Sequence, residues 1–227
     1  MDKKPTSNKD GGVGELASDW RLIERYQSTS RQNSANYSED TTNIFTFNTL
    51  GQFSLLWKNT SYATPSSIFF DFQNQRIRKV VLSEEEELQK TVDGLLLFRD
   101  GILAKWEDPE NAEGCSLIAE FREPSKREID AIWTNLVFAL IGGSFPHREC
   151  VNGMRMLDRL KRHRVVKFEV WLSVGLKKWK NNSEQYRVNE EKINNIINHF
   201  HSLFNPIVPL SVHTITTNDH FVANKNK

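Results

Sequence analysis

A helical repeat of apolar residues near the middle of the chain restricts the fold more than any other pattern in the sequence. Apolar side chains recur there at the spacing i, i+3, i+4 and i+7, which places them on one face of a helix. They are Ile129, Ile132, Trp133, Leu136, Val137, Leu140 and Ile141. Ser125 and Glu128 have the spacing of a capping box, and Gly142-Gly143 ends the repeat. The pattern predicts a long helix that buries Trp133 and points Phe138 away from the core.

Shorter patterns predict a set of strands around this helix. Leu95 to Phe98 is an apolar run typical of a buried strand, and Asp100-Gly101 after it is typical of a turn. Further strands are expected at residues 20–23, 44–47, 117–121, 154–159, 165–171 and 208–215.

Two further helices are expected. One begins at Thr49, where Thr49 and Gln52 have capping-box spacing, and its apolar face includes Trp57 as a core residue. The other runs from Val188 to Phe204. Between residues 67 and 93 the pattern is weaker: residues 68–70 could pair at a sheet edge, and residues 83–87 could begin a short acidic helix.

Composition limits the classes of protein to which this chain can belong. Its 227 residues suffice for one domain with a sizeable core, and a net charge of +1 excludes a global polycation. Cys115 and Cys150 lie far apart, which favours reduced thiols in the cytoplasm or nucleus. No apolar run is long enough to span a membrane, and the polar N-terminus does not have the pattern of a signal peptide.

The loop after the buried strand carries the first candidate site. Trp106 is followed directly by Glu107, in a segment whose Asp, Pro and Asn content argues against regular structure. An aromatic face beside a carboxylate suits a flat, electron-poor ligand with hydrogen-bond donors, such as an N7-methylated guanine. The structural alternative is that Trp106 caps the core and Glu107 is only solvated.

A basic hairpin carries the second candidate site. In its second strand Val166, Phe168 and Val170 alternate with Lys167, Glu169 and Trp171, so Lys167 and Trp171 share the non-core face. This arrangement favours an anion site beside an aromatic ring, and the alternative is a basic surface loop that aids solubility. Tyr37, in the polar loop 27–41, is either a loop anchor or a ligand contact.

Together these residues resemble the mRNA cap-binding family of translation initiation factor 4E, over about Trp20 to Asn205. Three blocks carry the resemblance in the same order: Leu97–Asn111 (LFRDGILAKWEDPEN), Ile132–Phe145, and Asn152-Gly153 through Arg159 and Lys167 to Trp171. The resemblance implies an α+β fold, with about three helices on the convex face of a curved antiparallel sheet and a cap slot on its concave face.

The resemblance also implies roles for individual residues. Trp106 and, by ungapped counting, Tyr37 would stack on the cap base, Glu107 would bind the guanine edge, and Trp171 would contact the N7-methyl group. Arg159 and Lys167 would bind the cap phosphates. The hairpin is longer than usual, so which of Lys161, Arg162 and Arg164 joins them stays open, with Lys161 and Arg162 as the expected pair.

Departures from the family pattern concern mainly the partner surface. The family's exposed helix Trp corresponds to Ser54, its phosphate-contacting Arg to Ser116, and its His-Pro-Leu run to Gly14-Glu15-Leu16. The family's partner-surface positions are occupied here by Leu50, Thr134 and Phe138. The resemblance therefore implies that the cap-binding residues are kept and that the partner-binding residues are replaced. The expected organisation is a disordered tail over 1–15, a cap-binding domain over 16–217 with an insertion at about 71–90, and a polar tail over 218–227.

The implied function is cap binding without catalysis or cofactor, with recruitment of a scaffold protein for translation initiation. The expected partners are capped mRNA and a helical peptide of a scaffold or repressor protein on the convex face, in the cytoplasm or nucleus and away from membranes. Alternatives are a cap-binding repressor or storage factor, and an interaction module with a weakened cap slot. No nucleophile–base motif, carboxylate pair or metal-ligand spacing supports an enzyme.

Overall fold

The computed structural model describes residues 14–27, 41–73, 75, 77, 79–82, 87–207 and 213–220. Tyr37 and most of both expected tails lie outside these residues. Seven described strands pair in one antiparallel sheet, in the order β2-β1-β5-β7-β8-β6-β9. Their bounds are β1 Glu15–Tyr26, β2 Thr41–Thr49, β5 Val92–Arg99, β6 Cys115–Arg122, β7 Val151–Arg159, β8 Val165–Leu172 and β9 His213–Asp219.

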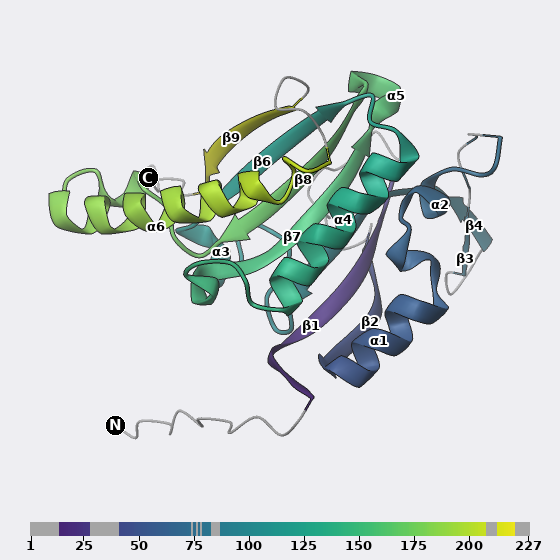
Figure 1. Ribbon diagram of the computed structural model, residues 1–227, viewed down its shortest axis with the longest axis horizontal. Helices are drawn as coiled ribbons and strands as arrows, with labels where there is room; N and C mark the ends of the chain where they lie inside the picture. Colours follow the sequence, from purple (N-terminus) through teal and green to yellow (C-terminus); the bar gives the residue numbers. More distant parts are fainter. Residues whose placement is uncertain are drawn as a thin grey trace.

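Three long helices lie against one face of this curved sheet (Figure 1). They are α1 Leu50–Asn59, α4 Lys126–Ile141 and α6 Ser183–Ser202. Shorter helices connect the strands: α2 Ser66–Phe69, α3 Pro109–Ala112 and α5 Leu160–His163, with 3₁₀ turns at Ser61–Ala63, Arg148–Cys150 and Lys177–Trp179. The predicted α+β class and the predicted antiparallel sheet are confirmed.

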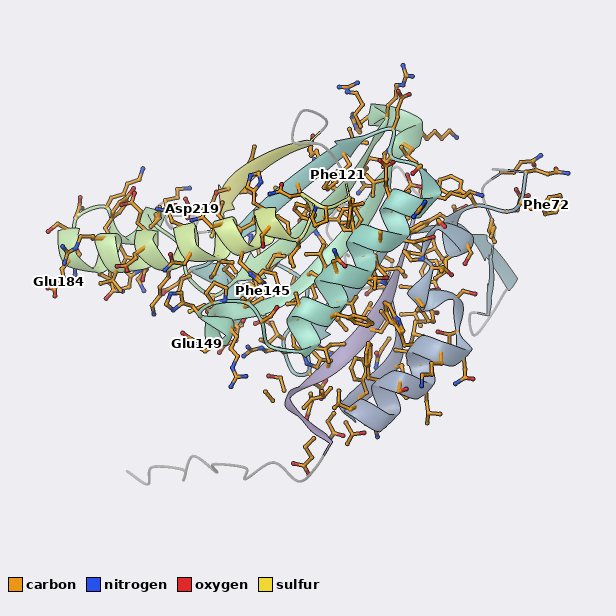
Figure 2. All side chains as sticks on the ribbon, viewed as in Figure 1. Phe72, Phe121, Phe145, Glu149, Glu184 and Asp219 are labelled. Carbon is orange, nitrogen blue, oxygen red and sulfur yellow. The ribbon has the colours of Figure 1, made fainter. Side chains whose placement is uncertain are left out.

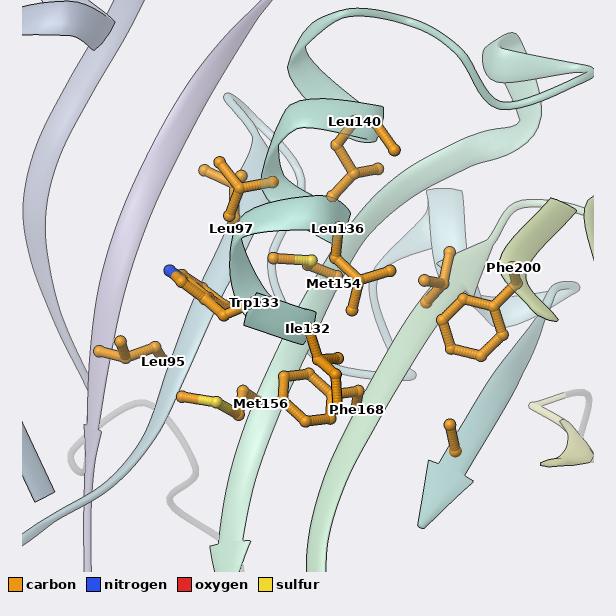
Figure 3. Packing of buried hydrophobic residues seen from close by; sticks show 14 of the residues in the cluster. Leu95, Leu97, Ile132, Trp133, Leu136, Leu140, Met154, Met156, Phe168 and Phe200 are labelled. Atoms are coloured by element: carbon orange, nitrogen blue, oxygen red, sulfur yellow. The ribbon is translucent and has the colours of Figure 1, made fainter. Parts of the chain in front are cut away.

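The predicted repeat forms α4 and supplies the centre of the core. The Ser125 hydroxyl accepts a bond from the Glu128 N–H at 3.2 Å, and the Glu128 carboxylate accepts one from the Ser125 N–H at 2.6 Å, which completes the capping box. Figure 3 shows the buried side chains of this helix packed against those of the sheet. Trp133 is buried as predicted, and its indole N–H donates to the Tyr62 carbonyl at 2.8 Å.

Side chains alternate between two faces along each strand, which divides the sheet into a helix-covered face and an open face. On β5, Leu95 and Leu97 belong to the main core beneath the helices. Leu96 and Phe98 instead join Ile23 and Trp171 in a second small cluster, called here the open-face cluster. The open face corresponds to the concave side that the sequence predicts for the cap slot.

The expectation of edge pairing at residues 68–70 is met only at Phe70, which forms an isolated β-bridge. Ile68 and Phe69 lie in α2 and not at a sheet edge, because Asp130 of α4 bonds the N–H and the hydroxyl of Ser66 at 2.8 and 2.7 Å and so caps a helical turn. Residues 83–86 of the expected acidic helix lie outside the described residues. Glu87 lies in strand β4 (Glu87–Lys90), which pairs with β3 (Lys79–Leu82).

Three other boundaries and contacts differ from the sequence expectation. Helix α6 begins at Ser183, before the expected Val188, because the Asn182 side chain caps it by accepting the Gln185 N–H at 3.1 Å. Strand β9 (His213–Asp219) continues past residue 215, where the expected last strand ends, and residues 208–212 of that expected strand lie outside the described ones. At α1, Gln52 bonds the N–H of Asn48 and not that of Thr49, so the predicted capping box is only half formed.

Among the described residues, no helix has both the length and the apolar character needed to cross a bilayer.

Candidate functional site

The loop that carries Trp106 and Glu107 is held in shape by its own polar side chains. Asp108 accepts a bond from the Leu103 N–H at 2.8 Å and, as the N-cap of α3, another from the Glu110 N–H at 3.0 Å. Pro109 at the first helical position then favours a single helical turn. The expectation that this segment lacks regular structure was therefore wrong in part.

Asn111 fixes the backbone that leads into Trp106. It is fully buried, and its amide donates to the Leu103 and Lys105 carbonyls at 2.8 and 3.1 Å. Its side-chain oxygen accepts from Asn152 of β7 at 2.9 Å, which ties the loop to the sheet. The sequence placed Asn111 only within the family pattern and gave no sign of this supporting role.

Trp106 and Glu107 are both presented to solvent by this braced loop. The Trp106 side chain is 45% exposed, which is unusual for a tryptophan. The Glu107 carboxylate is exposed and makes no hydrogen bond or ion pair with any described residue. Both groups are thus available to a ligand, and the alternative in which Trp106 caps the core does not fit its exposure.

Trp171 lies on the predicted face of β8 but is not open to solvent. It is buried in the open-face cluster, with Phe98 packed edge-on at a centroid distance of 5.7 Å. The Arg155 guanidinium lies over the indole at 4.8 Å, and the indole N–H donates to Glu169 at 3.2 Å. Alternation correctly gave the face of Trp171 but could not show what covers it.

The structure brings the two predicted cap-binding tryptophans together and adds a third ring. The Trp106 and Trp171 rings lie 6.5 Å apart between centroids, and His220, just after β9, contacts both of them. Sequence reasoning placed His220 in a polar tail. No local pattern could have revealed it, because its position depends on the pairing of β9 with β6.

The predicted phosphate-binding cations lie at the other end of the hairpin, and two of them are paired. Arg159 donates to Asp93 of β5 at 2.9 Å, and Lys167 forms an ion pair with Glu120 of β6. Lys161 is exposed and pairs with no described carboxylate. The side chain of Arg162 is outside the described ones.

Asp93 and Arg25 lie next to Arg159, one of the predicted phosphate-binding residues, and the sequence did not indicate this contact. Arg25 donates to both carboxylate oxygens of Asp93, at 2.8 and 2.9 Å. The register between β1 and β5 passes from Arg25–Gly94 to Tyr26–Val92, so Asp93 is the extra residue of a bulge. A bulge can redirect a side chain, and here Asp93 meets both arginines.

A pocket of about 140 Å³ opens on the open face beside the Trp106 loop. It is lined by Arg21, Ile23, Thr41, Asn43, Leu96, Leu103, Ala104 and Lys105. Strand β2 begins at Thr41, which lines this pocket, four positions after Tyr37 in the sequence. Tyr37 itself is outside the described residues, so its assignment as a stacking aromatic stays a prediction.

The helix-covered side carries a second feature, an exposed aromatic patch made by Phe53, Trp57 and Phe138. Phe138 is 49% exposed, as predicted, and its ring lies 5.9 Å from Phe53 and 5.3 Å from Trp57. Trp57, expected as a core residue, is half-buried and packs against the main core. Leu50 is exposed on α1, whereas Thr134 is half-buried on α4.

A separate cavity of about 170 Å³ lies near the end of α4, where Figure 2 shows Phe145 and Glu149. Trp20 and Leu140 also line it, together with the arginines Arg99 and Arg148. It is on the helix-covered side and does not adjoin the loop of Trp106.

The sequence model for the eukaryotic initiation factor 4E family matches residues 15–220. Over 111 residues the chain is 27% identical to eukaryotic translation initiation factor 4E1 of Drosophila melanogaster, and over 58 residues 40% identical to eukaryotic translation initiation factor isoform 4E of Prunus domestica. The matches span 42% and 26% of those proteins, and the same shares of this chain, so less than half of either relative is covered.

Similar solved structures cover most of the chain. C. elegans eIF4E-3 in complex with the 4E-binding protein Mextli and a cap analog has a TM-score of 0.61 at 15% identity, covering 91% of this chain and 92% of that one. Ascaris suum eIF4E-3 with the m7G cap has a TM-score of 0.62 at 17% identity, covering 94% of each. Schistosome eIF4E with m7GpppG and 4E-BP has a TM-score of 0.56 at 20% identity, covering 85% and 83%. At these identities the likeness establishes the fold.

Proposed function

Because the chain belongs to the eukaryotic initiation factor 4E family, we propose that it binds the 7-methylguanosine cap of mRNA and recruits a scaffold protein for translation initiation. The observation that carries this proposal is the loop that presents an exposed indole, Trp106, next to Glu107, a carboxylate without a partner among the described residues. The solved relatives with cap or cap analog bound support it.

The base is recognised by stacking and by charge. A base stacked on an aromatic side chain contributes about 1–3 kcal/mol. The delocalised positive charge of an N7-methylated guanine adds cation–π attraction of about 2 kcal/mol when the ring is desolvated. Tyr37, four positions before the pocket residue Thr41 in the sequence, supplies the second face of the sandwich.

Glu107 selects guanine. Its carboxylate accepts from the N1–H and N2–H donors of guanine, whereas adenine would turn the acceptor N1 toward a negative charge. Because Glu107 has no described partner within the protein, it loses no internal hydrogen bond when it binds the base.

The phosphates extend from the aromatic rings toward the basic hairpin. Lys167 and Trp171 lie on the same face of β8, four positions and therefore about 13 Å apart. Arg159 and Lys161 lie beyond Lys167, at the turn of the hairpin. Arg159, already oriented by Asp93, and the exposed Lys161 bind the phosphate chain together with Lys167, and Arg162 is the fourth candidate.

The protein partner is a helical peptide that covers the exposed aromatic patch on the helix-covered side. Leu50 and Phe138 are its main apolar contacts, with Thr134 at the edge. A scaffold peptide makes the chain an activator of translation in the cytoplasm, and a repressor peptide on the same surface makes it an inhibitor. The action of the chain is binding in both cases, without catalysis.

The test is a titration of the purified protein with N7-methyl-GTP and with GTP, followed by tryptophan fluorescence. Quenching that is selective for the methylated nucleotide supports cap binding through an aromatic slot. Equal or absent responses contradict it, and the chain is then an interaction module on this fold.

A further inference from the structure

The ring of His220 packs against the rings of both tryptophans predicted to bind the cap, Trp106 and Trp171. Its imidazole is stacked on the Trp106 indole, with 5.6 Å between centroids and 16° between the planes. The same imidazole meets the Trp171 ring at 4.6 Å and 50°. One face of Trp106 is thus covered, and the exposure of this side chain comes from the remainder of its surface.

The protein holds His220 in place without help from a ligand. The residue is only 3% exposed, and its backbone N–H donates to the Gly114 carbonyl at 2.8 Å. Its ring atom Nδ1 lies 3.1 Å from the Asn111 carbonyl oxygen. A carbonyl only accepts hydrogen bonds, so Nδ1 carries the proton, and the buried Nε2 has no hydrogen-bond partner among the described residues.

Asn111 bonds both the loop that carries Trp106 and the ring of His220. Its side chain fixes the loop backbone before Trp106, and its carbonyl fixes His220. Both stacked rings are therefore set by one buried residue, which fixes their mutual orientation before any ligand arrives.

We propose that His220, in its neutral form, is a positioning residue for cap recognition. It packs on one face of the Trp106 indole and so holds the opposite face in the orientation that stacks on the methylated base. This role rests on the proposed function. A ring that is already oriented loses less conformational entropy when the base binds, which strengthens binding without a new ligand contact.

The groups around the imidazole favour its neutral form, which is the form proposed to position Trp106. Burial lowers the pKa of His220, and the nearby Arg155 of β7 acts in the same direction. Glu169 of β8, Asp219 of β9 and the bond to the Asn111 carbonyl oppose this shift but do not cancel it. When the pH falls, the proton added at Nε2 has no acceptor among the described residues, so protonation weakens the packed stack.

Two substitutions separate a positioning role from a general structural one. His220→Ala removes the imidazole that is stacked on Trp106. It should weaken N7-methyl-GTP binding at about pH 7.5 by about tenfold, equivalent to about 1.4 kcal/mol. His220→Phe keeps a flat ring without a titratable group and should stay within about threefold of wild type. His201→Ala on α6 is the control for loss of a histidine, and a thermal unfolding curve checks that each variant is folded.

A pH profile gives the readout that a merely structural role would not produce. As the pH falls from about 7.5, the tryptophan emission of the ligand-free wild type should change with one protonation below the usual histidine range, because the pKa of His220 is lowered, and His220→Phe should abolish that change. The terminal phosphate of the nucleotide also titrates at about pH 6, so wild type and His220→Phe are compared at each pH, and the cap affinity of wild type should fall relative to that of His220→Phe as the pH is lowered. A Trp106→Phe variant should reduce the amplitude of the emission change.

The outcomes separate this role from the proposed function. If the wild type binds the cap and folded His220→Ala binds equally well, or if His220→Phe keeps the pH-dependent change, the role of His220 is overturned while cap binding stands. If His220→Ala does not fold, the His220→Phe profile still decides. If the wild type itself shows no selectivity for the methylated nucleotide, both inferences fail.

Discussion

Arg159 of β7 donates a hydrogen bond to Asp93 of β5 at 2.9 Å, so the first cation predicted for the cap phosphates is oriented by a neighbouring strand. Asp93 is buried and also holds Arg25. One carboxylate therefore fixes two guanidinium groups.

Asp93→Ala should lower the free energy of unfolding by about 2 kcal/mol, because it removes hydrogen bonds between charged groups and leaves two neighbouring guanidiniums without their shared partner. Urea denaturation measures this loss. Asp100→Ala is the control, since the pair of Asp100 with Arg21 is partly exposed and should contribute at most about 1 kcal/mol. Equal losses in the two variants would contradict a special role for Asp93.

Trp106→Ala should weaken N7-methyl-GTP binding by about 10- to 100-fold, in line with about 1–3 kcal/mol for one stacked base. Glu107→Ala should in addition remove the preference for guanine over adenine. Both side chains are exposed, so the thermal midpoint should stay close to that of wild type. Trp179→Ala, at a half-buried tryptophan in the 3₁₀ turn Lys177–Trp179, is the matched control and should leave affinity unchanged.

Phe138→Ala should weaken binding of a 4E-binding peptide by about tenfold or more, because exposed aromatic residues in a patch are typical binding hot spots. Cap affinity should not change, since Phe138 lies on the helix-covered side. Phe72→Ala is the control, because Phe72 is 90% exposed and is not one of the three residues of the patch. Loss of cap binding alone in Phe138→Ala would show that the patch is wrongly assigned.

Lys161→Ala should reduce the dependence of cap affinity on salt. Each phosphate neutralised by a basic side chain releases counterions, so the slope of log K against log salt should decrease by roughly 0.7. Titrations at several salt concentrations measure the slope. Lys58→Ala, on α1 at the helix-covered side, should leave the slope unchanged, and an unchanged slope in Lys161→Ala would exclude this residue from the phosphate site.

Alkaline pH should destabilise the fold through Tyr26. Burial, followed by the hydrogen bond to Glu24, raises the pKa of Tyr26 from 10.0 to about 12. Between these values the unfolded chain loses its phenolic proton before the folded chain does, so stability is retained below about pH 10 and declines toward pH 12. Tyr26→Phe should make this decline shallower in denaturation curves recorded at successive pH values, and an unchanged slope would rule the phenol out.

The sequence by itself determined those features that depend on neighbouring residues. The apolar repeat and the Ser125–Glu128 capping box specified α4 nearly to its ends, because helical spacing and terminal hydrogen bonds are local. The run Leu95–Phe98 specified a buried strand, and alternation along β8 placed Trp171 opposite the main core. The loop motif led directly to Trp106 and Glu107.

Only the tertiary structure decided what surrounds these residues. Trp171 is buried and not open, because Phe98, Arg155 and Glu169 come to it from neighbouring strands and positions. Asp93 reaches Arg159 through a bulge in the pairing of β1 with β5. His220 reaches Trp106 because β9 pairs with β6, and such contacts across a sheet are set by strand register, which no local pattern in the sequence encodes.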